Sequence, residues 1–372
     1  MNIVDNFRDI VLQNTPMIDV RAPVEFDKGT ILDAHSLPLM NDEERQLVGI
    51  CYKEKGQQQA STLGHELVCG DIRAQRIESW CNYFDENPNT HIFCFRGGLR
   101  SKTSQQWIND TGRDIPLIKG GYKAFRQYLM TSTENVIEQL PLHIISGKTG
   151  CGKTELLDAM DDILDLEGLA NHRGSAFGKN ISPQPSQINF ENQIGKRLLQ
   201  LQDRQQAQLV LEDESRTIGR CALPECLRQK MLLSDVYLLE DDFDNRVGRI
   251  LQDYVINMRL QYQHNFGEEE GFKRFGEYLV TAFNGIKRRL GSQRHTQLLE
   301  VLQQALSQQQ SQNDHSGHID WISVLLTDYY DPIYEYQLNK KQDRIVFKGN
   351  KNDLFDLFKE QRAKEQREQA KK

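Results

Sequence analysis

The chain has 372 residues, a formal net charge of -7 and a mean hydropathy of -0.63. This length allows two domains that each bury a core, and no stretch approaches the ~18 apolar residues of a membrane span. The acidic start, MNIVDNFRDIV, lacks the basic and apolar regions of a secretion signal. Seven scattered cysteines without a CxxC pair favour reduced thiols and argue against a zinc site. We therefore expect a cytoplasmic protein and exclude the membrane and disulfide-scaffold classes.

Residues 1–132 alternate short apolar runs with helical patterns, which predicts a small α/β domain. The run from Met17 to Val20 indicates a strand, with Asp19 and Arg21 at its end. The spacing EFxxGxIxxAxxxP follows, from Glu25 to Pro38. The domain closes with the segment PLIKGGYKAFR.

Cys94 follows a β-type run in the segment HIFCFRGGLRS, and a helix is expected to begin near Ser101. A thiol between a strand end and a helix N-terminus is favoured as the reactive thiolate. Nearby arginines and glycines suit the transfer of a group carried on a phosphate, a sulfonate or a sulfur donor. The residues predicted to bind such an oxyanion are Arg96, Gly97, Gly98 and Arg100. A buried structural cysteine is the alternative interpretation.

The spacing Cys-x5-Arg from Cys94 to Arg100 also fits cysteine phosphatases. Such enzymes need a general-acid carboxylate near the thiolate. Asp19 is a weak candidate for that acid, because it can equally hold Arg21 or the loop backbone. Phosphatase chemistry therefore stays open as an alternative.

A second pattern begins at Leu142, after a linker or short connecting helix predicted over residues 133–141. The segment HIISGKTGCGKTELL carries a β-type run, the full P-loop spacing and then a helical rhythm. Its glycines let backbone N–H groups turn inward around a phosphate, its lysine supplies charge and its threonine can ligate Mg²⁺. The predicted phosphate- or diphosphate-binding residues are Gly147, Gly150, Gly152, Lys153 and Thr154.

Two further segments supply candidates for the same site. An apolar strand over residues 208–211 ends at Glu212 and Asp213, with Glu214 as a weaker choice, where a second Mg²⁺-binding carboxylate is expected. The polar loop 171–178 can reach over a bound phosphate. Its candidate substrate ligands are His172, Arg173 and Ser175. The alternatives are an acidic surface turn and a solvated loop.

The remaining chain is predicted to complete a P-loop domain made of residues 142–240 and 318–338, with strands at 236–239 and 321–326. Between them, residues 241–317 form a helical, partly basic insertion. It mixes cations such as Arg246 and Arg249 with aromatics such as Tyr254, Tyr262, Phe272 and Phe275. That mixture suits looped RNA, although a solvated helical face explains it as well. Residues 339–372 are expected to form a C-terminal helix or tail.

The first domain, with EFxxGxIxxAxxxP, CFRGGLRS and PLIKGGYKAFR, resembles a rhodanese domain. Joined to GKTGCGKT and LEDESRTIG, it resembles the selenouridine synthase family. That resemblance extends to ERQLVGICYKEKGQQQASTLGHELV, residues 44–68, which ordinary rhodaneses lack, and to YYDPIYEYQL. The expected fold is therefore α/β, with an N-terminal rhodanese-like domain before a P-loop NTPase-like parallel-sheet domain with a helical insertion.

The resemblance implies a transferase that acts on tRNA carrying 2-thiouridine at the wobble position, with no role for DNA or a membrane. It implies replacement of sulfur by selenium from selenophosphate, through geranylation of the 2-thio group by geranyl diphosphate. Cys94 would handle the selenium or sulfur, and Arg96 and Arg100 would bind selenophosphate. The P-loop fits geranyl diphosphate, our preferred ligand, or ATP, with Mg²⁺ at Thr154 and Asp213. A plain sulfurtransferase and a P-loop kinase with a rhodanese-type thiol module are the rival functions.

Overall fold

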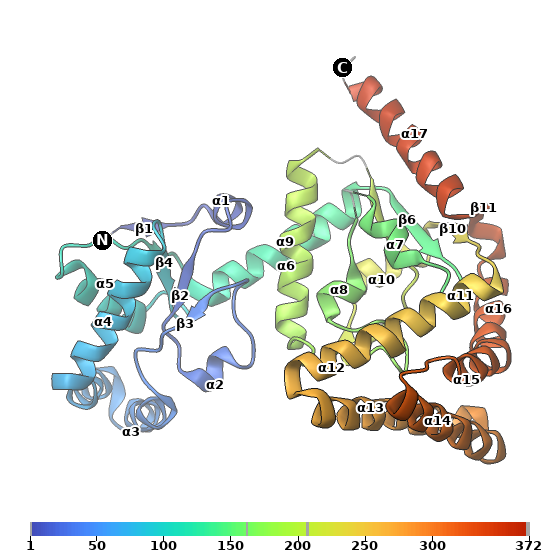
Figure 1. The fold of residues 1–372 in the computed structure, drawn as a ribbon. Helices are drawn as coiled ribbons and strands as arrows, with labels where there is room; N and C mark the ends of the chain where they lie inside the picture. Colours follow the sequence, from blue (N-terminus) through green and yellow to red (C-terminus); the bar gives the residue numbers. More distant parts are fainter. Residues whose placement is uncertain (1, 161–162, 206–207, 370–372) are drawn as a thin grey trace. The chain divides into compact units, whose positions relative to one another are not determined.

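The structure, a computed structural model, describes residues 2–160, 163–205 and 208–369. The chain forms two compact units (Figure 1). We call residues 1–138 with 185–205 the cysteine unit, and residues 139–184 with 206–372 the P-loop unit. Both units contain a parallel β-sheet, so the predicted α/β class is confirmed.

The cysteine unit is built on a five-stranded sheet in the order β1-β5-β4-β2-β3, and every pairing is parallel. The strands are β1 (Ile3–Val4), β2 (Met17–Asp19), β3 (His35–Ser36), β4 (His91–Phe93) and β5 (Leu117–Ile118). Alternate strand residues enter opposite cores: Ile18 and Ile92 join one cluster, whereas Met17 and Phe93 join the other. The sheet is therefore apolar on both faces, as parallel sheets require.

The helices of the cysteine unit are α1 (Phe7–Leu12), α2 (Pro23–Phe26), α3 (Asp42–Leu67), α4 (Gly70–Glu86), α5 (Leu99–Asn109), α6 (Gly121–Gln139) and α9 (Gln187–Asp203). The segment 44–68 thus lies mostly in α3. An Asn41–Glu44 capping box starts this helix, and Gly56 bends it at a φ of 84°. The segment 44–68, which ordinary rhodaneses lack, is consequently a bent helix.

Two segments differ from the predicted domain limits. Residues 133–139, expected within a linker, continue α6 without a break. Helix α9, expected in the P-loop domain, belongs to the cysteine unit. There Asn192 Nδ2 donates to the Thr30 carbonyl over 2.6 Å, and Arg126 Nη1 donates to Asn192 Oδ1 over 2.8 Å. These polar contacts join segments more than 60 positions apart, which an amphipathic pattern alone does not reveal.

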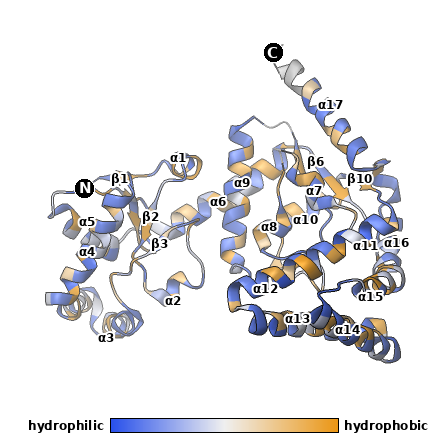
Figure 2. Ribbon diagram, in the orientation of Figure 1, coloured by the Kyte–Doolittle hydropathy of each residue, from blue (hydrophilic) through white to orange (hydrophobic). Residues whose placement is uncertain are grey.

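The P-loop unit has a four-stranded parallel sheet in the order β11-β10-β6-β7. Its strands are β6 (Leu142–Ser146), β7 (Leu209–Glu212), β10 (Asp235–Leu239) and β11 (Ile345–Gly349), and a small antiparallel pair joins β8 (Thr217–Ile218) to β9 (Cys221–Ala222). Figure 2 shows hydrophobic residues on β6 and β10, whereas α13 and α14 are largely hydrophilic. The central strands therefore lie in the core.

The helical elements of this unit are α7 (Lys153–Asp158), α8 (Leu166–Ala170), α10 (Glu225–Met231), α11 (Phe243–Ile250), the π-helical turn η1 (Leu251–Asn257), α12 (Met258–Phe266), α13 (Glu268–Leu290), α14 (Ser292–Gln312), α15 (His318–Leu325), the π-helical turn η2 (Leu326–Tyr330), α16 (Asp331–Asn339), the 3₁₀ turn η3 (Gln342–Arg344) and α17 (Lys351–Gln369). No helix in the described part of the chain has the length and apolar character of a membrane span.

The predicted strand at 321–326 is wrong, because these residues lie in α15 and η2. Trp321, Ile322, Leu325 and Leu326 are all buried in one helical cluster. Their spacing fits a helix, which a short apolar run does not distinguish from a buried strand. The edge strand is instead β11, within the region predicted as helix or tail. The end of that prediction, residues 370–372, lies outside the described residues.

The aromatic residues of the predicted insertion build a core. Phe275 is fully buried, and Tyr254, Tyr262 and Phe272 pack against the same cluster. This cluster also contains Phe177, from the loop that follows α8. Packing in this core excludes Phe275 from an RNA-stacking surface, whereas the other three rings are partly exposed and their stacking on RNA stays a prediction.

Candidate functional site

Cys94 lies at the end of β4, in a tight loop that leads into α5. Gly97 adopts a φ of +62°, and a Cβ atom there would lie 3.0 Å from the Gly120 nitrogen. The Tyr122 N–H donates to the Cys94 carbonyl over 2.9 Å. The loop can therefore close only with glycine at position 97, and its contact with the start of α6 fixes the cysteine backbone.

The Cys94 side chain is 3% exposed, and the Ser101 hydroxyl donates to its sulfur over 3.1 Å. Ser101 lies in the first turn of α5, whose N-terminus faces the same loop. A hydroxyl donor and a helix N-terminus both stabilise a thiolate. The structure thus places Ser101, which was predicted only as the start of a helix, as a hydrogen-bond donor to the predicted nucleophile Cys94.

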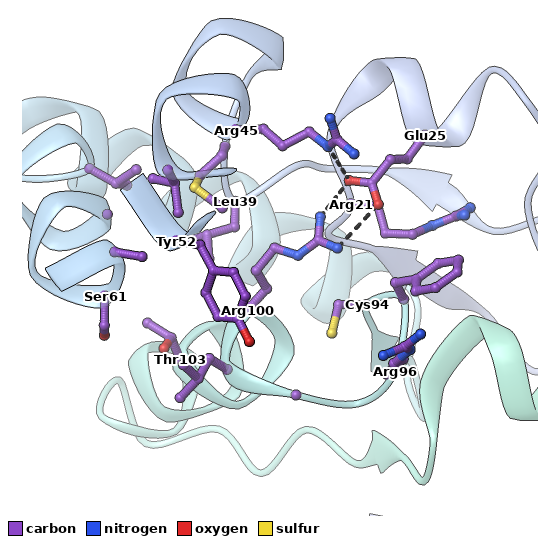
Figure 3. A pocket seen from close by; sticks show the side chains of 18 of the residues that line it. Arg21, Glu25, Leu39, Arg45, Tyr52, Ser61, Cys94, Arg96, Arg100 and Thr103 are labelled. Atoms are coloured by element: carbon purple, nitrogen blue, oxygen red, sulfur yellow. Dashed lines mark hydrogen bonds and ion pairs between the residues drawn. The ribbon is translucent and has the colours of Figure 1, made fainter. Parts of the chain in front are cut away.

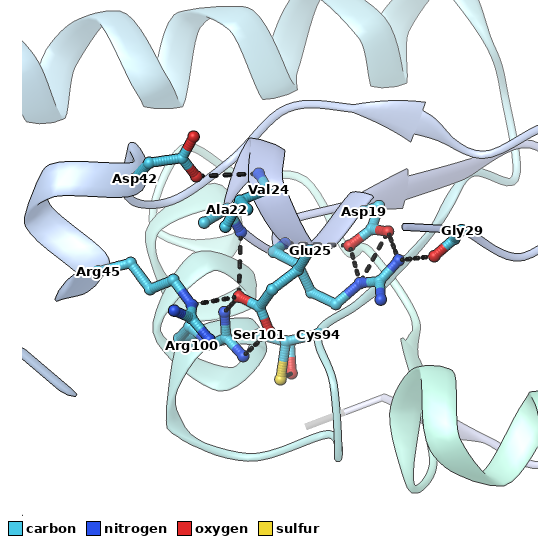
Figure 4. Close-up of polar contacts among 11 residues, drawn as sticks. Asp19, Ala22, Val24, Glu25, Gly29, Asp42, Arg45, Cys94, Arg100 and Ser101 are labelled. Atoms are coloured by element: carbon cyan, nitrogen blue, oxygen red, sulfur yellow. Dashed lines mark hydrogen bonds and ion pairs between the residues drawn. The ribbon is translucent and has the colours of Figure 1, made fainter. Parts of the chain in front are cut away.

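Glu25 from α2 holds the predicted oxyanion ligand Arg100. The Arg100 guanidinium donates to both Glu25 carboxylate oxygens, over 2.5 and 3.1 Å, and Arg45 Nε donates over 3.1 Å (Figure 4). Burial alone would raise the pKa of Glu25, but the hydrogen bonds and positive charge of Arg100 hold it below its usual value. Burial alone would lower the pKa of Arg100, and Glu25 and Cys94 raise it. An anion must therefore compete with Glu25 for Arg100.

Asp19, the weak general-acid candidate, has a different role in this structure. Its carboxylate is fully buried and accepts hydrogen bonds from Arg21 Nε and Nη2 over 2.6 to 2.9 Å. The Thr30 hydroxyl donates to it as well, over 2.9 Å. These donors occupy the Asp19 carboxylate, which therefore holds Arg21 and Thr30 in place. This finding disfavours the phosphatase interpretation.

A cavity of about 850 Å³ opens beside Cys94 (Figure 3). Arg21, Glu25, Arg96, Gly98 and Arg100 line it together with the sulfur-bearing loop. Helix α3 supplies another wall, which includes Arg45, Val48, Tyr52, Ala60 and Ser61. Among the described residues Arg96 has no ion-pair partner, and its guanidinium lies 5.7 Å from the Phe95 ring centre. The cavity therefore offers a thiol and cationic side chains to one ligand.

The P-loop connects β6 to α7 and has the predicted glycines at its turns. Gly152 adopts a φ of +89°, and a Cβ atom there would lie 3.2 Å from Arg249 Cζ. The Lys153 ammonium donates to the Gly147 carbonyl over 2.8 Å and to the Tyr334 hydroxyl over 3.3 Å. Burial would lower its pKa, but Tyr334, Cys151 and Glu167 raise it overall, so this lysine is a permanent cation.

Helix α16 lies against the P-loop. Lys148 Nζ donates to Glu335 over 2.9 Å and to Asp331 over 3.4 Å. Arg246 donates to Asp331 over 3.0 and 2.5 Å and to the Thr149 carbonyl over 2.9 Å. Arg249, predicted as part of an RNA-binding surface together with Arg246, contacts the Gly150 carbonyl and Asp241. Arg246 is 4% exposed, so its assignment to an RNA surface is wrong, whereas Arg249 is partly exposed and also contacts the P-loop.

Asp213, one of the two carboxylates predicted for Mg²⁺, lies beside the P-loop strand. It accepts a hydrogen bond from the Ser146 hydroxyl over 2.6 Å and contacts the Lys341 ammonium at 2.5 and 2.6 Å. Thr154, the other expected ligand, is exposed. A hydroxyl and a carboxylate fit the oxygen preference of Mg²⁺, but a cation at Asp213 must replace Lys341. No group of three or more His, Cys, Asp or Glu suited to a metal occurs among the described residues.

Glu212 does not share this position. Its carboxylate is 1% exposed and accepts a hydrogen bond from the Leu166 N–H over 3.2 Å. Burial raises its pKa well above the usual value. Glu212 therefore supports the start of α8, and the structure favours Asp213 as the carboxylate beside the P-loop.

The loop 171–178 packs on a pair of carboxyl groups. A Cβ atom at Gly174 would lie 2.6 Å from Glu167 Oε1 and 2.9 Å from Glu214 Oε1. Burial first, and then the neighbouring Glu167, raise the pKa of Glu214 to about 8. Burial raises the pKa of Glu167 as well. Both carboxyl groups therefore lie beside the loop 171–178, although only Glu214 was a predicted candidate.

The three candidate ligands of this loop differ in position. Ser175 lines a small cavity together with Thr149 of the P-loop, and the Arg173 guanidinium lies 5.2 Å from the Tyr254 ring centre. His172 forms an isolated β-bridge with Lys179, and burial lowers its pKa. Ser175 is thus brought to the P-loop, whereas His172 supports the loop itself.

Comparison with known proteins agrees with these features. Residues 140–365 match the family model described as the tRNA 2-selenouridine synthase AAA domain. A tRNA 2-selenouridine synthase from Marinobacter nauticus is 51% identical over 345 residues, which cover 93% of this chain and 94% of that protein. Proteins of the same name from Shewanella denitrificans and Shewanella sediminis are 52% and 48% identical over 92% and 96% of this chain, and over 94% and 97% of their own length. The chain therefore belongs to the tRNA 2-selenouridine synthase family.

Proposed function

We propose that this protein converts 2-thiouridine at the wobble position of tRNA to 2-selenouridine, with selenophosphate as the selenium donor and a geranylated nucleoside as the intermediate. The observation that carries this proposal is the presence of two different reactive sites in one chain of this family. One site is a buried thiol beside arginines in a large cavity. The other is a P-loop with a protonated lysine. The first unit acts as a rhodanese-type module on this account.

The P-loop serves the alkylation step. The 2-thio sulfur attacks the first carbon of geranyl diphosphate, a C–S bond forms, the C–O bond breaks, and the diphosphate leaves with the electron pair while N3 of the base loses its proton. Lys153 and the backbone N–H groups of the loop stabilise the charge on the leaving diphosphate. We propose geranyl diphosphate rather than ATP as the ligand of this loop.

Mg²⁺ would supply further charge neutralisation for the diphosphate when bound. Thr154 and Asp213 are the residues that would hold it, and Lys341 would move from Asp213 at that moment. The Lys341 ammonium meanwhile neutralises the carboxylate. The contacts with Ser146 and Lys341 therefore orient the Asp213 carboxylate.

The cysteine unit serves the selenium step. Alkylation turns the 2-thio group into a thioether, which leaves as a thiolate more readily than a thione does. The net exchange consumes 2-(geranylthio)uridine, selenophosphate and water and yields 2-selenouridine, geranylthiol and phosphate, without a change of oxidation state. Arg96 binds the selenophosphate oxyanion, Arg100 joins it by exchanging Glu25, and Cys94 handles the transferred selenium.

Nucleoside mass spectrometry of 2-thiouridine-containing tRNA tests the proposal. The tRNA is incubated with geranyl diphosphate and selenophosphate and with the native, Cys94→Ala or Lys153→Ala protein. We expect 2-selenouridine from the native protein, accumulation of the geranylated nucleoside with Cys94→Ala, and unreacted 2-thiouridine with Lys153→Ala.

Each rival function predicts a different result. A sulfurtransferase would release sulfur from thiosulfate in a reaction that depends on Cys94 and is indifferent to Lys153. A P-loop kinase would turn over nucleotide without tRNA. Unmodified tRNA after incubation with the folded native protein would contradict the proposal.

A further inference from the structure

The cavity beside Cys94 has a second, apolar part that an oxyanion does not use. Core side chains form much of its wall: Leu39, Met40, Val68 and Trp107 are each at most 7% exposed and all line the cavity. Val48 and Ala60 of α3 add further apolar surface. Residues of the hydrophobic core therefore form part of the cavity wall, in addition to the residues at its opening.

This apolar wall extends away from the sulfur of Cys94, although Arg45 of α3 also lines this part of the cavity. In Figure 3 Cys94 and Arg96 lie on one side of the view and Ser61 lies on the other, with Tyr52 between them. Ser61 and Thr103 interrupt the apolar wall with hydroxyl groups. A single ligand that fills this space must combine a polar head near the sulfur with an extended apolar part.

The volume points to the same kind of ligand. A cavity of about 850 Å³ lies within the range of roughly 300–1,000 Å³ that holds a drug-sized molecule. A selenophosphate ion, with one phosphorus and four surrounding atoms, occupies only a small part of that space. Helix α3 creates the extra room, because it stands over the loop and turns Val48 and Ala60 inward.

We infer that the apolar part of this cavity binds the hydrocarbon chain of an S-alkylated 2-thiouridine, so that C2 of the base faces Cys94 and the arginines. The inference rests on the proposed function, because the thioether is its intermediate. The chain acts as an anchor: its burial against Leu39, Met40 and Trp107 adds affinity for the alkylated nucleoside only. The cavity thereby selects the nucleoside that carries the better leaving group.

Binding of free nucleosides to the full-length protein tests this inference without catalysis. Titration calorimetry compares 2-thiouridine with its S-methyl, S-dimethylallyl and S-geranyl derivatives. Burial of each methylene group is worth about a fourfold gain in affinity, so we expect affinity to rise by more than 100-fold from the S-methyl to the S-geranyl compound. Equal affinity for these two compounds would overturn the inference.

Substitutions on α3 locate the binding site. Ala60→Phe fills the cavity and should weaken S-geranyl binding at least tenfold, with less than a twofold effect on S-methyl binding. Gln59→Phe, at the exposed neighbouring position, is the matched control and should bind like the native protein. If Ala60→Phe lowers the melting temperature, Val48→Asp provides an independent test, with Leu47→Asp at an exposed position as its control. Unchanged S-geranyl binding in both cavity variants would overturn the inference.

Free geranyl diphosphate carries the same chain and needs its own measurement. We expect Lys153→Ala to lose geranyl diphosphate binding and to keep S-geranyl nucleoside binding. If diphosphate binding survives Lys153→Ala and disappears in Ala60→Phe, the cavity holds the free diphosphate, and the inference is wrong. If the native protein makes 2-selenouridine from tRNA while the nucleosides bind without regard to chain length, only the chain site fails and the proposed function stands.

Discussion

The charged groups at the two candidate sites differ in how many contacts they already make with other protein groups. In the cysteine unit one carboxylate, Glu25, holds Arg100, while Arg96 faces the cavity without an ion-pair partner among the described residues. In the P-loop unit the segment 331–341 supplies partners to each of three groups. Its residues Asp331, Tyr334, Glu335 and Lys341 contact Lys148, Lys153 and Asp213.

This difference has a physical consequence for ligand binding. A ligand in the cysteine unit needs one exchange, in which its oxyanion replaces the Glu25 carboxylate at Arg100. A diphosphate at the P-loop must replace several contacts of α16 and its following turn, so part of its binding energy is used to move that segment. We therefore expect the cysteine cavity to be preformed and the P-loop to rearrange when it binds its ligand.

The largest effect on stability is expected from removal of Arg246, the buried arginine that joins α16 to the P-loop. Arg246 is 4% exposed and binds both Asp331 and the Thr149 carbonyl. Loss of one partner from a buried ion pair costs about 3–5 kcal/mol. We expect Arg246→Met to destabilise the P-loop unit by that amount, measured by urea unfolding with hydrogen exchange of β6. Stability within 1 kcal/mol of the native protein would mean that α16 is not held through this residue.

In the cysteine unit, the corresponding change removes the carboxylate that holds Arg100 and should strengthen anion binding. Glu25→Gln frees the Arg100 charge and should raise the affinity for selenophosphate by about tenfold, or about 1.4 kcal/mol. Titration calorimetry against the Glu54→Gln protein, altered at an exposed position of α3, measures this gain. Unchanged affinity would show that Glu25 does not compete with the ligand.

The same carboxylate also predicts a pH dependence of stability. The pKa of Glu25 is lowered in the folded protein by Arg100, so the ion pair stabilises the protein above the unfolded value near 4.5. That stabilisation is lost as the pH falls through the lowered, folded pKa. The free energy of unfolding of the native protein, measured with urea, should therefore fall in this acid range by an amount that Glu25→Gln does not show.

The smallest effect is expected at the tyrosine that contacts the P-loop lysine. Tyr334→Phe removes the hydroxyl that lies 3.3 Å from Lys153 Nζ and keeps the ring. The hydrogen bond from the Lys153 ammonium is long, so we assign it about 0.5–1 kcal/mol, and geranyl diphosphate should bind roughly two- to fivefold tighter without it. Tyr336→Phe, at an exposed position of the same helix, is the control. Weaker binding by Tyr334→Phe would instead make the hydroxyl a ligand of the diphosphate.

The sequence allowed prediction of the features that depend on local pattern. The strand before Cys94, the P-loop between β6 and α7, and the acidic end of β7 follow from residue type and spacing over short segments. Glu25 was visible as part of a spaced motif, but its contact with Arg100 joins residues 75 positions apart. Pairings of that kind depend on the folded topology.

Most of the features that escaped prediction are long-range contacts. Lys341 meets Asp213 across 128 positions, and Tyr334 meets Lys153 across 181. The run at 321–326 was predicted as a strand because five apolar or aromatic residues in six positions do not distinguish a buried strand from a buried helix turn. Helix α9 joins the cysteine unit through Leu199 in one of its cores and through polar contacts such as that of Asn192 with Thr30. Hydrophobic periodicity indicates an apolar face on this helix but not which domain buries it.

The most direct test of the two-site account bypasses the P-loop. Fully geranylated tRNA and selenophosphate are given to the native, Lys153→Ala and Cys94→Ala proteins, and 2-selenouridine is followed by mass spectrometry. The account predicts that Lys153→Ala forms 2-selenouridine at the native rate and that Cys94→Ala forms none. A folded Lys153→Ala protein as inactive as Cys94→Ala would contradict the division of the two steps between the two units.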